Sequence, residues 1–152
     1  LFLLERVDKS AEDAFSLYHA SEEYLDHTEI KLMSKVTKKI MSSINYNEVI
    51  TRRKKNYILL DEILSQRNLL YFTLESSLVP MIYPYLVNDV NMHKILIENK
   101  VYVPKYWANV LVWTHGKGFE TNLFKRLVPI PIDQRYTEVD MKRILSIINY
   151  NL

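Results

Sequence analysis

The chain contains no cysteine, and this absence removes several classes of site at once. Without a thiol it can form no disulfide, no cysteine-based zinc site, no cysteine-held iron–sulfur cluster and no thiol nucleophile. Only two glycines occur, Gly116 and Gly118, so neither a Walker loop nor a GxGxxG dinucleotide fingerprint can be built. The same shortage excludes the G-x-S-x-G turn of serine hydrolases.

An excess of charge of one sign and long apolar runs are missing as well. Twenty Lys and Arg residues stand against 18 Asp and Glu, and a net charge of +2 gives little basis for attraction to nucleic acid or an anionic membrane. No run approaches the roughly 20 apolar residues of a membrane span. We therefore expect a cytoplasmic protein without membrane contact, whose 48% hydrophobic residues form a compact core.

The ionisable residues show no pattern of a metal site or a catalytic pair. The four histidines, at positions 19, 27, 93 and 115, have no HxxxH spacing and no acidic residues that would complete a site. Adjacent carboxylates such as Asp61 and Glu62 point apart on a helix, so we expect them at the surface. No metal ligand and no catalytic residue is predicted.

Periodicity divides the chain into a helical lead-in, residues 1–45, and a mixed region, residues 46–152. Helices are predicted over 11–26, 30–43, 46–66, 89–98, 119–127 and 137–149, two of them with capping boxes at Ser10 and Thr137. Strands are predicted over 69–73, 81–87, 101–103 and 128–132. We expect an α+β fold with a small, mainly antiparallel or mixed sheet of three to four short strands. The lead-in is expected to continue from a missing N-terminal region.

Shared faces predict which side chains form the core. Apolar residues repeat at three and four residues along the 46–66 and 137–149 helices, which predicts burial of Tyr57, Leu60, Ile144 and Ile148. Arg53 interrupts the apolar stripe of the first of these helices. It belongs to the cluster Arg52–Lys55, whose four charges cannot share one helix face and which is typical of a solvated surface. Arg53 alone is a candidate for a functional role.

The most unusual segment is Tyr102-Val103-Pro104-Lys105-Tyr106-Trp107. Here a predicted strand ends in proline and is followed by a lysine and two aromatic residues. Lys105, Tyr106 and Trp107 can form a cationic and aromatic wall for a flat, polar or phosphorylated ligand. Alternatively, the two aromatic side chains cover the edge of the sheet as part of the core.

A second concentration of distinctive residues is Ile130-Pro131-Ile132-Asp133-Gln134-Arg135-Tyr136. The prolines favour an extended backbone, and the segment ends just before a capped helix. Arg135 is a candidate for binding a carboxylate or phosphate, because its guanidinium presents a planar fork of donors. The alternative is a structural turn in which Asp133 and Arg135 tie the last helix to the sheet.

The order of these segments resembles the C-terminal region of DegT/StrS-type sugar aminotransferases. The resemblance covers roughly residues 40–150 and rests on Arg53-Lys54-Lys55-Asn56-Tyr57, Tyr83-Pro84-Tyr85, the Val101–Trp107 segment, Leu127–Tyr136 and Asp140-Met141-Lys142-Arg143-Ile144. Those proteins are fold-type I enzymes that use pyridoxal phosphate. The chain departs from many of them in having Pro104-Lys105-Tyr106-Trp107, without histidine, where they carry a His-Tyr substrate loop. This departure leaves a nucleotide sugar as substrate in doubt.

The resemblance implies a small domain that closes over an active site and lines its substrate entrance. It implies that the cofactor lysine and most of the phosphate site belong to a missing N-terminal large domain, so we expect this chain to bind no cofactor and to be inert alone. Substrate contacts would come from Lys105, Tyr106, Trp107 and Arg135. The implied partners are a small-molecule amine donor and acceptor, such as a sugar, and a second copy of the parent enzyme in a homodimer.

Two other classes of function remain open from the sequence. Arg52–Lys55 and the aromatic segment are compatible with a small module that binds nucleic acid or an acidic partner, although the nearly balanced charge disfavours it. A structural or dimerisation domain is the third reading, with the helical lead-in as its interface.

Overall fold

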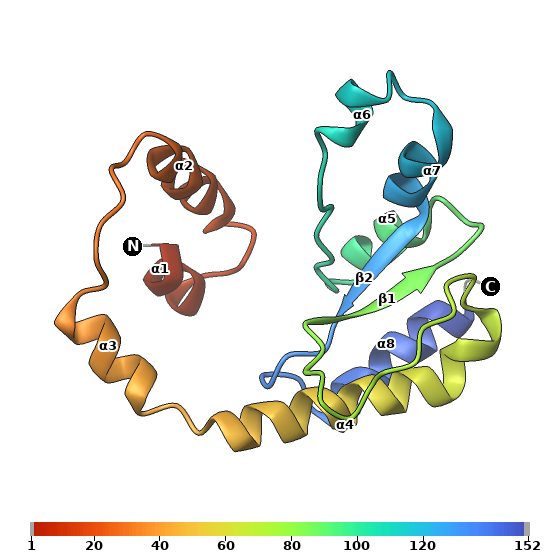
Figure 1. Cartoon of the computed structure of the whole chain (residues 1–152), viewed down its shortest axis with the longest axis horizontal. Helices are drawn as coiled ribbons and strands as arrows, with labels where there is room; N and C mark the ends of the chain where they lie inside the picture. Colours follow the sequence, from red (N-terminus) through yellow and green to blue (C-terminus); the bar gives the residue numbers. More distant parts are fainter. Residues whose placement is uncertain (1, 151–152) are drawn as a thin grey trace. The chain divides into compact units, whose positions relative to one another are not determined.

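The computed structural model describes residues 2–150, and the chain divides into two compact units, Leu1–Ile44 and Asn45–Leu152. Helices dominate both the element order and the length of the chain, and the second unit adds a small antiparallel sheet (Figure 1). The predicted α+β class is therefore confirmed. No helix within residues 2–150 has the length and apolar character needed to cross a membrane.

The first unit consists of three helices, α1 (Phe2–Asp8), α2 (Phe15–Asp26) and α3 (Lys35–Ser42). Ser10 and Asp13 bond to each other, since the Asp13 amide donates to Ser10 Oγ at 3.1 Å and the Ser10 hydroxyl donates to Asp13 Oδ2 at 2.7 Å, but they do not cap α2, whose N-cap residue is Ala14. The regular helix α2 begins two residues after this turn. Ser34 caps α3 by accepting from the Thr37 amide. The helix has no buried residue and exposes Val36 and Ile40 on one side.

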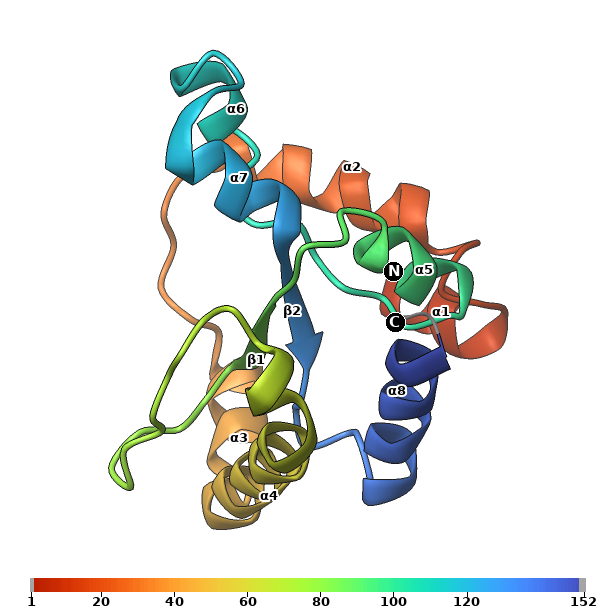
Figure 2. The same ribbon diagram turned by 90° about the vertical axis from the view of Figure 1, so that its right-hand side faces the viewer.

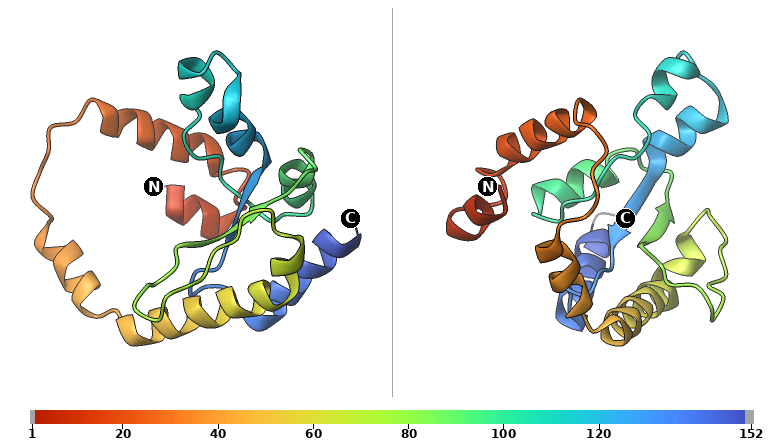
Figure 3. Two further views of the ribbon diagram at one scale, coloured as in Figure 1. Left: turned by 45° about the vertical axis from the view of Figure 1, so that its right-hand side comes forward. Right: turned by 60° about the vertical axis from the view of Figure 1, so that its left-hand side comes forward.

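The second unit contains the strands. Its elements in chain order are α4 (Tyr46–Leu64), a short 3-10 turn (Ser65–Arg67), β1 (Ile82–Leu86), α5 (Met92–Glu98), α6 (Val110–Trp113), α7 (Gly118–Arg126), β2 (Leu127–Pro131) and α8 (Glu138–Tyr150). α4 packs against α8 and β1, α5 packs against α8, and α6 packs against α7. Figure 3 shows α4 and α8 side by side. β2 follows α7 without a connecting loop (Figure 2).

The sheet is an antiparallel ribbon in which Tyr83 pairs with Ile130 and Tyr85 with Val128. These four side chains are buried, because alternate residues of a strand share one face. Pro84 pairs with Pro129, so neither residue of that pair donates a backbone hydrogen bond to the ladder. The Pro84 carbonyl accepts from Asn68 on the opposite edge of β1, so the polar groups of this position face away from β2 and the proline removes no bond between the two strands.

One hydrophobic core holds the second unit together. All four predicted core residues, Tyr57, Leu60, Ile144 and Ile148, belong to it, which confirms the assigned helix faces. Thr137 and Asp140 form the predicted capping box of α8, where the Thr137 amide donates to Asp140 Oδ2 at 2.7 Å. Periodicity and caps therefore located the packing helices correctly.

The described residues contain two strands, fewer than the three to four expected. The predicted strand 69–73 is irregular, and the side chain of Asn68 explains part of this difference. Its Oδ1 accepts from the Leu86 amide at 2.9 Å, and its Nδ2 donates to the Pro84 carbonyl at 2.8 Å. The Asn68 side chain, together with the Leu69 amide that donates to the Leu86 carbonyl at 3.0 Å, thus satisfies the edge of β1 that a third strand would have paired.

The predicted strand 101–103 is extended and half-buried but lies outside the ladder. The Val101 amide donates to the Leu96 carbonyl at 2.8 Å, which completes a Schellman cap with Lys100 at a φ of +62°. Val101 and Val103 still bury their side chains in the core, with Tyr102 exposed between them. The segment therefore alternates like a strand without being hydrogen-bonded as one, and Pro104 has no amide to donate.

Candidate functional site

An apolar hollow of about 140 Å³ lies beside the segment Pro104–Trp107, which we call the aromatic loop. All four residues of the loop line it. The other lining residues come from α6, α7 and β2, and they are Val110, Glu120, Leu123, Phe124, Leu127 and Pro129. The structure therefore brings together three of the four predicted site residues, Lys105, Tyr106 and Trp107.

Lys105 is tied to the end of α7 rather than extended into solvent. Its Nζ donates to the carbonyl oxygens of Phe124 and Lys125, each at 3.1 Å, and lies 5.5 Å from the centroid of the Phe124 ring. Carbonyls at a helix C-terminus lack intrahelical partners and attract a cation. Burial lowers the pKa of the Lys105 amine. The positive charge anchors the loop, so an anionic ligand would have to compete with these two carbonyls for it.

Tyr106 and Trp107 form the outer wall of the hollow. Their ring centroids lie 5.6 Å apart with planes inclined at 50°. Trp107 is 68% exposed and has a φ of +58°, in the left-handed region that disfavours bulky side chains. Such backbone conformations cost roughly 1–3 kcal/mol and concentrate at functional sites. Lys100 and His115 share a positive φ but end helices, so it is the exposure of the indole that leaves Trp107 available for contact with a ligand or partner.

His93 on α5 supports the base of the aromatic loop. Burial, followed by the nearby Lys105 charge, lowers the pKa of His93, and hydrogen bonding to the carbonyls of Val103 and Pro104 partly offsets this effect. Its Nε2 atom is buried and has no hydrogen-bond partner within the described chain. The neutral imidazole therefore suits this position better than the charged form.

The α6 and α7 helices form the remaining side of the hollow. The hydroxyl groups of Thr114, at the end of α6, and Thr121, on α7, are 2.6 Å apart and join the two helices at a partly buried point. His115 has a φ of +48° and ends α6, since the Gly116 amide donates to the Leu111 carbonyl at 2.9 Å. This cap accounts for the position of His115 in the turn.

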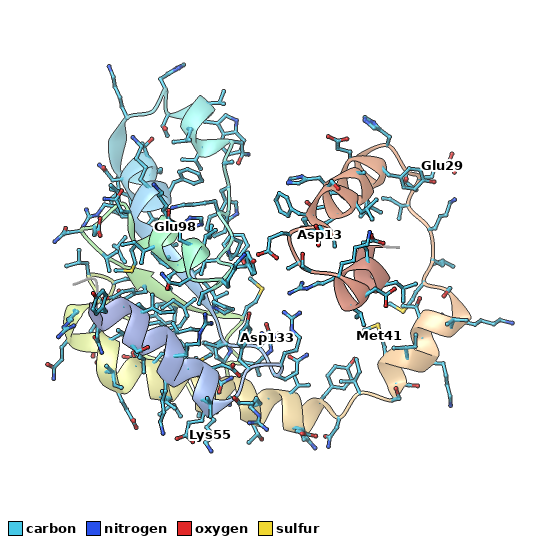
Figure 4. All side chains as sticks on the ribbon, turned by 180° about the vertical axis from the view of Figure 1, so that it is seen from behind. Asp13, Glu29, Met41, Lys55, Glu98 and Asp133 are labelled. Carbon is cyan, nitrogen blue, oxygen red and sulfur yellow. The ribbon has the colours of Figure 1, made fainter. Side chains whose placement is uncertain are left out.

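Arg135, the fourth predicted site residue, does not line the hollow. Its Nε donates to Asp133 Oδ1 at 2.8 Å and its Nη2 to Asp133 Oδ2 at 2.9 Å. This hydrogen-bonded pairing lowers the pKa of the Asp133 carboxyl and raises that of Arg135. Figure 4 shows Asp133 on the segment between β2 and α8. The arrangement fits the structural turn that was the alternative for this motif.

Asn56, which the sequence analysis did not single out, fixes the same turn from α4. Its buried Nδ2 lies 3.2 Å from the Ile132 carbonyl oxygen and 3.1 Å from that of Tyr136. A buried donor without such partners would destabilise the fold. The only sequence signal was an asparagine on the apolar face of a predicted helix.

The basic cluster Arg52–Lys55 is largely engaged within the chain. Arg53 Nη1 donates to the carbonyls of Pro80 and Met81, each at 3.2 Å, and Lys54 donates to the Ser76 carbonyl. Lys55, labelled in Figure 4, lies 3.9 Å from a Glu138 carboxylate oxygen, and this contact links α4 to α8. Arg53, the charged residue within the apolar stripe of α4, thus binds the segment that leads into β1.

The part of the chain that the structure describes contains no cluster of side chains that could form a metal site. No group of three or more His, Asp or Glu side chains within residues 2–150 could hold an ion.

Comparisons of the chain with protein-family models, curated proteins and solved structures give no match. The hollow, the aromatic loop and the residues that hold them are therefore the candidate functional site of the described chain.

Proposed function

We propose that residues 46–152 are the C-terminal small domain of a pyridoxal-phosphate-dependent aminotransferase and form one wall of its substrate entrance. The observation that carries the proposal is the aromatic loop, in which an exposed Trp107 is held in a strained conformation at the rim of an apolar hollow. A surface of this kind suits contact with a substrate or with a second domain. We further propose that the parent enzyme acts in the cytoplasm.

The residues around the hollow do not fit pyridoxal phosphate itself. The cofactor requires a lysine for its aldehyde and several donors for its phosphate, and it then supplies an electron sink for amine transfer. Here the charged side chains among the described lining residues are Lys105 and Glu120, and the Lys105 amine is already bound to two carbonyls. The proposal therefore assigns the cofactor to a separate large domain and gives this chain a substrate-facing role.

The test is to express the complete reading frame that encodes these residues and to find where the cofactor attaches. The purified protein is expected to show the visible absorbance of lysine-bound pyridoxal phosphate. Borohydride reduction followed by peptide mapping should place the cofactor on a lysine outside residues 1–152. A cofactor fixed to a lysine of this chain, or a protein that binds none, would contradict the proposal.

The alternative of a nucleic-acid module has less support from the geometry. Three of the four cations in Arg52–Lys55 are engaged by carbonyls or a carboxylate of the chain itself. Binding to phosphates would require these contacts to be exchanged.

A docking role for the helical unit has a specific observation in its favour, since α3 exposes Val36 and Ile40 on one side and carries three lysines. Such a face can dock on another protein surface.

A further inference from the structure

The hollow beside the aromatic loop has the dimensions of a small-ligand site. Its volume of about 140 Å³ is close to that of engineered apolar cavities that bind benzene, which are about 150 Å³. Unlike those cavities it is open at one side, where Trp107 is exposed. A ligand could therefore enter without any rearrangement of the core.

Flat groups dominate the walls of the hollow. The rings of Tyr106, Trp107 and Phe124 come from the loop and α7, and the rings of Pro104 and Pro129 add two rigid apolar surfaces. Aromatic rings prefer offset-stacked or edge-to-face contacts with other aromatic rings. This lining favours a planar ring as the ligand over a flexible or branched chain.

The charges around the hollow indicate which polar group such a ring would carry. The Lys105 amine is bound to the Phe124 and Lys125 carbonyls and is poorly placed to bind an anion. Glu120 is the one carboxylate among the described lining residues, and its exposed side chain has no ion pair or hydrogen bond within residues 2–150. An ionised carboxylate only accepts hydrogen bonds, so its complement is a donor on the ligand.

We propose that the hollow binds an aromatic ring system of one or two fused rings, with an N–H on its edge that donates to Glu120. The ring packs between the aromatic loop and Phe124. If the aminotransferase proposal holds, the substrate of the parent enzyme carries such a ring, and that extension rests on the proposed function. Binding of the ring by this chain does not rest on it, because the hollow is formed by this chain's residues alone.

The test uses the 152-residue chain with indole and 1-methylindole, which have similar shapes but differ in the N–H. Methyl resonances of Val110, Leu123 and Leu127, which line the hollow, are followed by NMR during each titration. Indole is expected to shift them saturably with a Kd of roughly 1 mM, as befits a nine-atom ligand. The methylated ring should bind roughly fivefold more weakly, since it cannot make the hydrogen bond.

Two variants test whether Glu120 accepts the hydrogen bond from the ring. Glu120→Ala should bind indole as weakly as it binds 1-methylindole, whereas the matched change Glu62→Ala, at an exposed site on α4, should leave the fivefold preference intact. A folded chain whose lining methyl groups show no saturable shift would overturn the site. Equal affinity for the two rings would overturn the role of Glu120. Neither result depends on where the cofactor of a parent enzyme is attached, so failure here is distinct from failure of the proposed function.

Discussion

The amine of Lys105 and the backbone of Phe124 form a clamp between the aromatic loop and α7. Nζ lies 3.1 Å from the Phe124 carbonyl oxygen and 5.5 Å from the centroid of the same residue's ring. A single cation thus satisfies a carbonyl at the helix end and contacts an aromatic face of the hollow. The clamp explains how a loop with an exposed, strained tryptophan keeps a defined position.

Removing this amine should loosen the loop. Lys105→Met keeps most of the side-chain stem but leaves two carbonyls without their donor, so we expect a loss of roughly 1 kcal/mol in the free energy of unfolding. Urea titration followed by tryptophan fluorescence is the suitable measurement, because Trp107 and Trp113 both lie in this region. The exposed Lys117→Met is the control and should change little. Equal midpoints for the two variants would count against the clamp.

Because Leu60 belongs to the core, shortening its side chain should lower the free energy of unfolding strongly. This side chain is completely buried on α4, and Leu60→Ala should destabilise the protein by about 2–5 kcal/mol. Ile58 on the same helix is about half exposed, and Ile58→Ala should stay within roughly 0.5 kcal/mol of the parent protein. Urea unfolding monitored by circular dichroism compares the two. Similar costs would mean that the buried face of α4 has been misassigned.

Tyr83 and Tyr85 are a matched pair on β1 that differ in their hydroxyl partners. Both rings are buried, but Tyr83 OH donates to Asp61 Oδ1 at 3.0 Å, whereas Tyr85 OH is buried with no partner in the described chain. Tyr83→Phe should therefore cost about 1 kcal/mol. Tyr85→Phe should be neutral or stabilising, because it removes an unsatisfied polar atom. A greater loss for Tyr85→Phe in thermal unfolding would refute this assignment.

The burial of His93 should make the free energy of unfolding depend on pH. Burial lowers the pKa of the folded His93 below the ordinary 6.5 of the unfolded chain, so the unfolded state binds more protons between these two values. The free energy of unfolding should hence fall as the pH drops through 6.5 toward the lower, folded pKa. His93→Gln should lose this contribution. Urea unfolding of both proteins from pH 8 to pH 5 measures the difference, and parallel curves would exclude His93 as its source.

Local sequence patterns were sufficient to predict the helices that form the core and the two paired strands. Leu60 and Ile144 repeat with helical spacing, and the Thr137–Asp140 box marks where α8 begins. The prolines of 128–132 favoured an extended backbone, and β2 lies there. These features depend on residues close together in the sequence, which explains why they could be recognised.

The remaining features depend on partners distant in sequence. The side chain of Asn68 bonds to the edge of β1 at Pro84, 16 residues away, and nothing in its own neighbourhood indicates that it takes the place of part of a strand. The residues of the aromatic loop were identified from their types, but the contact of Lys105 with α7 spans 19 residues and has no local signature. The strain at Trp107 is likewise a property of its backbone angle, which the residue type does not indicate.

The most direct measurement of the central claim is the activity of the complete enzyme with Trp107→Ala. Loss of the indole from the substrate wall should lower kcat/KM about tenfold or more while leaving the absorbance of the bound cofactor unchanged, because the cofactor is assigned to the other domain. Trp113→Ala, an equally exposed tryptophan on α6 that does not line the hollow, is the matched control and should retain the parent kcat/KM. Normal kcat/KM in Trp107→Ala, with only the stability reduced, would contradict a substrate-facing role for the aromatic loop.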